Sequence, residues 1–203
     1  MGATPAEFAI VPANEASWAD LQAIFGTTSD PGHCYCQWFK LRNRDWASTP
    51  VTERRAGLRE QTHCGNPDAE RTTGMVAYLG TEPVGWVAAE PRPAYQRLAS
   101  ARYIWDGREE DKADDSVWAV TCFVTRRGYR RRGISYALAA ATVGFARQRG
   151  AQALEAYPIL VAPGERVSAA ALYVGTSSMF AAAGLAEVSR IGSRRVLMRV
   201  DFS

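Results

Sequence analysis

The order of apolar and polar positions along the chain predicts alternating strands and helices. The expected strands cover residues 8–11, 72–79, 83–90, 117–124, 151–157, 185–191 and 195–200. The expected helices cover residues 18–25, 50–63, 133–149 and 167–183. Residues 31–44 are rich in aromatic side chains and have no regular pattern. Residues 91–116 are polar and are interpreted as an insertion or a long functional loop.

The clearest unit is a strand, a basic loop and a helix. Residues 117–124 are almost continuously apolar, as in a buried strand. Residues 133–149 carry an apolar stripe at helical spacing, and Gly150 suits the end of that helix. The strand over 151–157 then runs parallel to the first, as in a β-α-β crossover. The two strands before this unit and the two after it are expected to form antiparallel hairpins.

The composition is that of an ordinary globular protein. The chain has 203 residues, of which 47% are hydrophobic and 22% are charged. No apolar run approaches the roughly 20 residues that a membrane helix needs. The first residues lack the basic and apolar regions of a secretory signal. We therefore expect one domain over residues 1–203, located in the cytoplasm, with no membrane partner.

Basic charge is concentrated in one short segment. The net charge is +3, and five arginines stand within seven positions, so the rest of the chain sums to −2. These are Arg126, Arg127, Arg130, Arg131 and Arg132. A nucleic-acid-binding protein usually spreads its basic charge over a face. The compact cluster favours a small polyphosphate and disfavours nucleic acid as a partner.

The cysteines allow two interpretations. His33, Cys34 and Cys36, together with His63 and Cys64, have the side chains that zinc prefers. Their spacing matches no established zinc pattern, and reduced cysteines are common in protein cores. We expect reduced cysteines and no metal, with stoichiometric zinc in the purified protein as the contrary result.

The junction after the strand at 117–124 is suited to an anion. Gly133 stands where the next helix begins, so an anion can approach the unpaired backbone N–H groups of its first turn. Ser135 is small, and the neighbouring arginines add charge-assisted contacts. A phosphate or pyrophosphate is the expected ligand, and a solvated basic loop is the alternative. The sequence has neither the nucleotide P-loop pattern nor the glycine pattern of a dinucleotide fold.

The segment from Cys122 to Ser135 resembles motif A of the GNAT superfamily of N-acetyltransferases, which reads Gln/Arg-x-x-Gly-x-Gly/Ala. Arg130, Gly133 and Ser135 occupy its fixed positions, with serine in place of glycine or alanine. The order of elements is also similar over about residues 70–200. The resemblance implies a mixed α/β (α+β) domain with a central mixed sheet of six to seven strands. About four helices would flank the sheet, and a long insertion would precede the motif strand.

The resemblance implies acetyl-CoA as the co-substrate and a role for each motif residue. Main-chain groups of Cys122, Phe123 and Val124 would bind the pantetheine arm. The pyrophosphate would be held by Arg130, Arg131, Arg132, Gly133, Ile134 and Ser135. A neutral amine would attack the thioester directly, and a backbone donor would stabilise the oxyanion.

The general acid departs from the family pattern. A tyrosine four residues before the late glycine often protonates the leaving thiolate in this superfamily, and here that position is Phe180. Tyr173, two helical turns earlier, is expected to lie on about the same helix face and to substitute, as is Ser177. The alternative for Tyr173 is a packed aromatic residue of the core.

Glu155 is the candidate general base. It stands in an otherwise apolar strand, where an unpaired charge is costly, so it requires a partner or a function. A solvent-facing position or a salt bridge to an arginine is the alternative.

The acceptor is expected to be a small-molecule primary amine, a metabolite or an antibiotic. There are two aromatic groups, and acidic residues lie near the second, which suits an amine on an apolar body. The alternative is local core together with a solvated acidic loop. The groups are Tyr35, Trp38, Phe39 and Trp46, and then Tyr95, Tyr103 and Trp105. A non-catalytic acyl-CoA-binding module, supported by Phe180, and a protein amine acetyltransferase remain alternatives. The sequence leaves both a monomer and a homodimer open.

Overall fold

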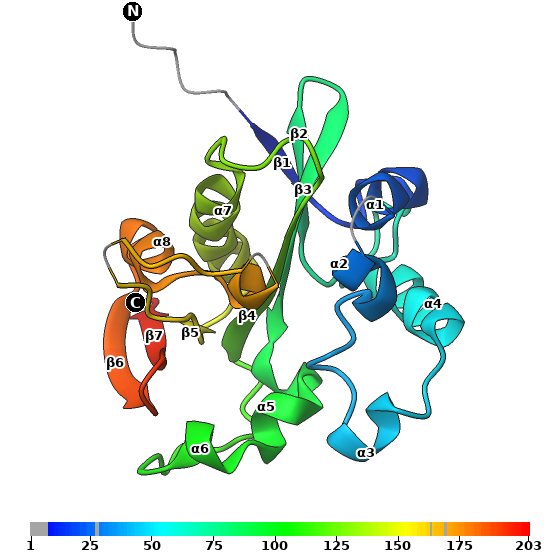
Figure 1. Ribbon diagram of the computed structural model, residues 1–203. Helices are drawn as coiled ribbons and strands as arrows, with labels where there is room; N and C mark the ends of the chain where they lie inside the picture. Colours follow the sequence, from blue (N-terminus) through cyan, green and yellow to red (C-terminus); the bar gives the residue numbers. More distant parts are fainter. Residues whose placement is uncertain (1–7, 27–28, 163, 169) are drawn as a thin grey trace, which may run out of the picture.

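The computed structural model describes residues 8–26, 29–162, 164–168 and 170–203 (Figure 1). Its centre is a seven-stranded sheet in the order β1-β2-β3-β4-β5-β7-β6. β4 and β5 run parallel, and the other neighbouring strands are antiparallel. The mixed sheet of six to seven strands predicted from the sequence is therefore confirmed. The strands are β1 (Ala9–Pro12), β2 (Met75–Leu79), β3 (Glu82–Pro91), β4 (Val117–Thr125), β5 (Ala153–Ala156), β6 (Ala186–Ile191) and β7 (Arg195–Asp201).

Helices cover both faces of the sheet. α7 and α8 lie on one face, and α1, α2 and α4 lie on the other (Figure 1). The described helices are α1 (Trp18–Phe25), α2 (Ser29–Cys34), α3 (Asn43–Trp46), α4 (Val51–Thr62), α5 (Gln96–Ser100), α6 (Arg102–Trp105), α7 (Ile134–Gln148) and α8 (Ser177–Ala182), with 3₁₀ turns η1 (Arg92–Ala94) and η2 (Ala171–Val174). None of these helices is long and apolar enough to cross a membrane.

Local signals explain the helices that the sequence predicted. The hydroxyl of Ser17 accepts a hydrogen bond from the Asp20 N–H, and the Asp20 carboxylate accepts one from the Ser17 N–H, which is a capping box. α1 therefore begins at Trp18 as predicted. Pro50 precedes the first residue of α4, where its missing N–H costs nothing.

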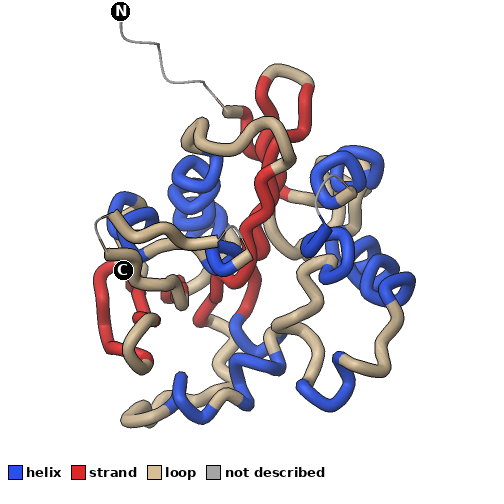
Figure 2. The backbone as a smooth tube through the Cα atoms, viewed as in Figure 1, coloured by secondary structure: helices blue, strands red, loops and turns tan. Residues whose placement is uncertain are grey.

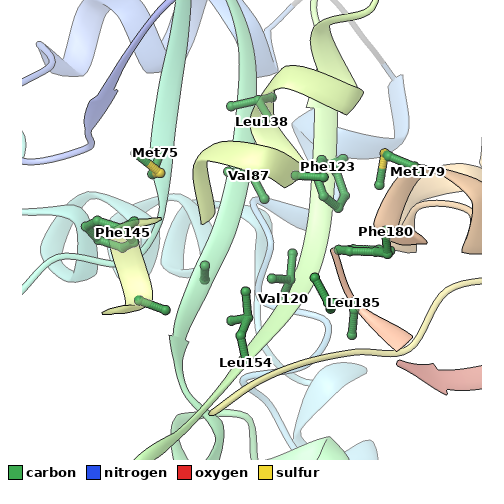
Figure 3. Close-up of a cluster of buried hydrophobic side chains, with 14 of the residues drawn as sticks. Met75, Val87, Val120, Phe123, Leu138, Phe145, Leu154, Met179, Phe180 and Leu185 are labelled. Carbon is green, nitrogen blue, oxygen red and sulfur yellow. The ribbon is translucent and has the colours of Figure 1, made fainter. Parts of the chain in front are cut away.

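α7 packs on the sheet through its apolar stripe. Leu138 and Phe145 lie among buried side chains of β2, β3 and β4, including Val87 (Figure 3). The ring of Phe145 meets the ring of Trp118 at a centroid distance of 5.5 Å. Gly85 lets the helix approach closely, because a Cβ there would lie 2.5 Å from the side chain of Ile134.

An extra residue interrupts β4 in its middle. Ala88 pairs with Cys122 and Ala89 pairs with Val120, so Thr121 is a β-bulge. The bulge changes which face each later side chain occupies. As a result, Cys122 packs against the cluster on the α1 side of the sheet.

Three predicted segments differ from the structure. Residues 31–44 overlap two short helices, α2 and α3, and residues 91–116 contain η1, α5 and α6. The helix predicted over 167–183 is wrong, because η2 and α8 are separate elements. Gly175 divides them with φ 79° and ψ 179°, a conformation that only glycine adopts readily.

Candidate active site

The loop between β4 and α7 folds over one end of the sheet (Figure 2). Gly128, Arg131 and Gly133 have positive φ values of 92°, 62° and 84°. Alternation of this kind turns successive backbone N–H groups toward a common centre, which suits an anion. Arg131 adopts this strained conformation without being a glycine, at a cost on the order of 1 kcal/mol.

The first turn of α7 presents its backbone to this loop. Ala137 donates the first intrahelical hydrogen bond, 3.0 Å to the carbonyl of Gly133. The N–H groups of Ile134, Ser135 and Tyr136 precede that bond and are therefore available to a ligand. The first turn has no acidic residue, and open space surrounds the position where a Gly133 Cβ would lie.

The loop arginines divide into two kinds. Arg126 is tied back to the sheet, with Nη1 2.7 Å from the carboxylate of Glu82. Arg130, Arg131 and Arg132 are exposed at the α7 end of the loop. These three arginines extend the positive end of the α7 dipole into solvent.

β4 and β5 separate beyond the bulge. Their parallel pairing covers residues 117–120 of β4 and ends at Ala156 of β5. Cys122, Phe123 and Val124 thus have no β5 partner, and they pair only with β3 on their other edge. An extended chain such as a pantetheine arm can pair with β4 there by adding strand-like hydrogen bonds.

These features fit coenzyme A as judged from the chain's own groups. A diphosphate would meet N–H groups without intrahelical partners, a helix dipole and three exposed arginines at the start of α7. The thioester end would lie along β4 near the bulge at Thr121. The predicted coenzyme residues from Cys122 to Ser135 are thus brought into one continuous strand, loop and helix start.

Phe180 and Tyr173 lie on opposite sides of the sheet. Phe180 is fully buried in the α7-side cluster, where its ring packs against Phe123 at 5.8 Å between centroids (Figure 3). Tyr173 packs against Phe39 on the other side, 6.1 Å between centroids. The expectation that Tyr173 shares a helix face with Phe180 is therefore wrong, because Gly175 ends the turn between them.

Tyr173 nevertheless lies against the motif strand. η2 packs on β4, and Tyr173 contacts the cluster that contains Cys122. Burial raises the pKa of Tyr173 above its ordinary value of 10.0, and the charge of Arg195 lowers the pKa by less. The phenol is thus protonated at neutral pH. Ser177, the other predicted acid, begins α8 and donates its N–H to the carbonyl of Ile159 at 3.1 Å.

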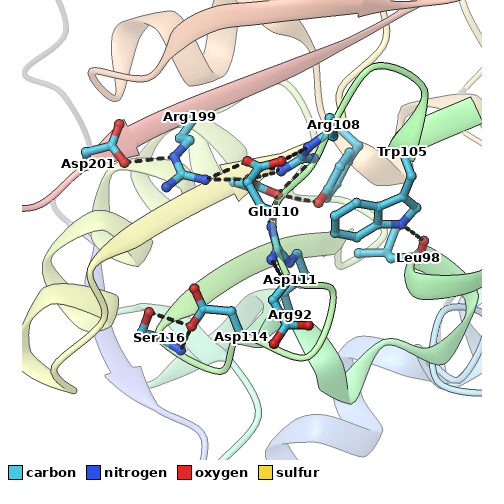
Figure 4. A network of polar contacts seen from close by, with 12 residues as sticks. Arg92, Leu98, Trp105, Arg108, Glu110, Asp111, Asp114, Ser116, Arg199 and Asp201 are labelled. Atoms are coloured by element: carbon cyan, nitrogen blue, oxygen red, sulfur yellow. Dashed lines mark hydrogen bonds and ion pairs between the residues drawn. The ribbon is translucent and has the colours of Figure 1, made fainter.

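Glu155 is fully buried and surrounded by cations. It accepts hydrogen bonds from Arg92 Nη1 at 3.2 Å, Arg108 Nη2 at 2.6 Å, Arg199 Nη1 at 2.9 Å and the Tyr157 hydroxyl at 2.6 Å. Figure 4 shows Arg108 and Arg199 meeting at this point with Glu110. Burial raises the pKa of Glu155, and the bonds from Tyr157 and Arg108 outweigh that effect, so the net pKa is lowered from 4.5. For Glu155 the structure thus shows salt bridges to arginines, which was the alternative to a general base.

The cysteines do not gather around one point. Cys36 Sγ lies 2.9 Å from Cys122 Sγ and accepts a hydrogen bond from Trp86 Nε1 at 3.1 Å. Cys64 is elsewhere, bonded to the hydroxyl of Thr62. Burial raises the pKa of Cys34 to about 12, so its thiol is neutral. Among the described residues, no group of three or more His, Cys, Asp or Glu is placed to hold a metal ion.

A cavity of about 270 Å³ lies next to Tyr157, the residue that follows β5. Aromatic rings and two arginines form its distinctive lining: Trp38, Phe39, Tyr103, Tyr157, Tyr173, Arg97 and Arg195. We call it the aromatic cavity. The sequence pointed to some of these rings but missed both arginines and Tyr157, because residues so distant along the chain meet only through folding. The acidic residues of the 91–116 segment do not line it.

Comparisons with known proteins agree with this geometry. The acetyltransferase (GNAT) family matches residues 38–174. The ribosomal-protein-alanine N-acetyltransferase of Brucella melitensis is 17% identical with a TM-score of 0.52, over 96% of this chain and 99% of that one. The protein yncA of Salmonella typhimurium, solved with its cofactor acetyl-CoA, is 13% identical with a TM-score of 0.52, over 96% and 93%. No curated protein sequence matches significantly.

The chain belongs to the acetyltransferase (GNAT) family. Acetyl transfer is the activity that names this family, and the acetyl-CoA of yncA is bound by that protein. The fold expected from motif A is thereby confirmed, whereas the individual site residues stay predictions.

Proposed function

We propose that this protein transfers the acetyl group of acetyl-CoA directly to the primary amine of a small molecule. The observation that carries the proposal is the aromatic cavity of about 270 Å³, which is lined by Tyr157, the residue after β5, and by Tyr173, whose turn packs on β4. A cavity of this size accommodates a small molecule better than a folded protein surface. In this proposal, residues 1–203 form one domain that carries the function.

In the proposed reaction the diphosphate binds at the start of α7, on the N–H groups of Ile134 and Ser135 with Arg130 to Arg132 around it. Main-chain groups of Cys122 to Val124 hold the pantetheine arm. The amine enters from the aromatic cavity and attacks the thioester carbonyl. Thr121, which the bulge leaves outside the regular pairing with β3, is proposed to offer its N–H to the oxyanion.

Tyr173 is the proposed general acid. The carbon–sulfur bond breaks, and Tyr173 gives its proton to the leaving thiolate. The phenolate then takes the proton that the new amide nitrogen releases, so a neutral amine requires no further base. Ser177 is the alternative acid in this scheme.

We assign Glu155 a positioning role in place of the predicted general base. The four residues that bond its carboxylate are Arg92, Arg108, Arg199 and Tyr157, and its side chain is fully buried. Tyr157 lines the aromatic cavity, so the network holds one cavity wall in place.

The test is thiol release from acetyl-CoA with a panel of small amines and a peptide that carries lysine and a free N-terminus. Acetylated product is identified by mass spectrometry. We expect small amines to be acetylated with higher kcat/KM than the peptide. Preference for the peptide would support a protein amine acetyltransferase, as the name of the Brucella melitensis protein states for that protein. Binding of acetyl-CoA without amine-dependent thiol release would support the non-catalytic module suggested by Phe180.

A further inference from the structure

The aromatic cavity has an unbalanced charge. Among its described lining residues Arg97 and Arg195 are cationic, and no lining residue is acidic. Neither arginine takes part in the ion pairs found in the described part of the chain. The neighbouring hollow of about 380 Å³ does contain Glu165, but that carboxylate is paired with Arg194.

Arg97 is fixed in place with one donor unused. Its guanidinium stacks on Trp38, 3.7 Å from the ring centroid, and donates to the Trp38 carbonyl and to Asn43 Oδ1. Its Nη2 is buried and has no hydrogen-bond partner in the structure. A buried N–H donor without an acceptor is costly, so an acceptor supplied by a ligand would relieve it.

Arg195 is held in the cavity lining by a main-chain contact. It begins β7, and its Nη1 donates to the carbonyl of Tyr157 at 3.3 Å. It also interacts with Tyr173, the proposed acid. Its charge therefore lies next to the residue that is proposed to act on the thioester.

We infer that the acceptor is an amino-acid-like amine whose carboxylate is bound by Arg97 and Arg195 and whose apolar body packs on the aromatic rings. An amine without an anionic group would bring its own positive charge toward two uncompensated guanidinium groups. A carboxylate cancels that repulsion and accepts the charge-assisted bonds that guanidinium groups make best. The inference rests on the proposed function and adds to it the class of the acceptor.

The first experiment compares matched acceptors on the unmodified protein. L-phenylalanine, L-phenylalaninamide and phenethylamine differ at the carboxylate, and L-leucine with L-leucinamide repeats the comparison on an aliphatic body. We expect kcat/KM for at least one free acid to exceed that of its amide by about tenfold or more, because a charge-assisted contact is lost in the amide. Equal or higher kcat/KM for the amides and for phenethylamine would overturn the inference.

The second experiment removes each arginine. Arg97→Gln and Arg195→Gln are expected to raise KM for the free acid about tenfold and to leave KM for its amide nearly unchanged. Arg190→Gln is the matched control, because Arg190 lies on the same hairpin and pairs with Glu187 on the exposed surface. Arg97 also makes structural bonds, so Arg195→Gln decides the outcome if the Arg97 variant does not fold. A free-acid preference that survives in Arg195→Gln contradicts the inference.

Binding separates this inference from the proposed function. If no amine is acetylated, the proposed function fails. The acceptor class is then read from the rise in melting temperature that L-phenylalanine or L-leucine produces. A rise in melting temperature that is lost in Arg195→Gln and kept in Arg190→Gln supports the amino-acid-like acceptor. No rise, or an equal rise in both variants, overturns the inference.

Discussion

The Nη2 atom of Arg108 lies 2.6 Å from the Oε1 atom of Glu155, which is the only charged residue of the buried strand β5. Arg92, buried as completely as Glu155, binds the same carboxylate. The two elements that meet here are the 91–116 segment and β5. The Glu155 carboxylate thus binds the 91–116 segment to the central sheet. That segment contributes one side of the aromatic cavity.

Glu155→Gln is expected to lower the free energy of unfolding by about 3 kcal/mol or more, because Arg92 would stay buried without its counter-charge and Arg108 would keep only the more exposed Glu110. Urea denaturation followed by circular dichroism measures the change. Glu187→Gln removes a carboxylate from an exposed pair with Arg190 and is expected to cost less than about 1 kcal/mol. Equal losses in the two variants would show that burial of the Glu155 network contributes nothing.

The stability given by Glu155 depends on pH with a definite sign. Its pKa in the folded protein is lowered from 4.5, so folding favours the carboxylate. The contribution is complete above about pH 5 and is lost as pH falls through the folded pKa. The difference in unfolding free energy between the unmodified protein and Glu155→Gln should therefore shrink below pH 4.5. A difference that is constant from pH 7 to pH 3 would contradict this.

Gly133→Ala is expected to weaken acetyl-CoA binding about tenfold, because alanine disfavours the φ of 84° that turns the first N–H groups of α7 toward the ligand. Isothermal titration with coenzyme A measures the change. Gly150→Ala is the matched control: φ there is 80°, the surrounding space is also open, and the site lies beyond the other end of α7. Both variants should lose similar stability, but only Gly133→Ala should lose affinity.

Tyr173→Phe is expected to lower kcat by about 10²-fold or more and to change KM for acetyl-CoA little, since a positioned acid contributes 10²–10⁴-fold. The raised pKa keeps the phenol protonated, so kcat of the unmodified protein should hold until pH exceeds 10. Steady-state kinetics across pH measure both effects. Tyr78→Phe is the control. It also removes a tyrosine hydroxyl, but that hydroxyl is bonded to Asp20 and Tyr78 does not line the aromatic cavity. Unchanged kcat in Tyr173→Phe would leave Ser177 as the acid.

Local chemistry explains what could be predicted. The capping residue Ser17, Pro50 and the positive-φ glycines Gly133 and Gly150 act on their immediate neighbours, so the ends of α1, α4 and α7 follow from a few adjacent residues. The same locality explains the coenzyme motif, which is one continuous segment of strand, loop and helix.

Gly175 shows where prediction from adjacent residues fails. Its φ of 79° and ψ of 179° divide the residues predicted as one helix, and nothing in the local pattern separates this glycine from a tolerated one. A Cβ there would lie 2.3 Å from Met179 and 2.8 Å from Phe180, so packing requires the glycine. The break sends Tyr173 and Phe180 to opposite sides of the sheet.

The sequence by itself predicted the proposed donor half of the reaction, because Gly133 and the arginines around it act through neighbouring backbone. The proposed acceptor half depends on tertiary structure alone. Arg97 and Arg195 meet at one cavity through packing of the 91–116 segment against the final hairpin. Glu155 finds its three arginines in the same way. Contacts between residues so far apart depend on the whole fold, whereas the conformation of the turn at Gly133 depends on a few adjacent residues.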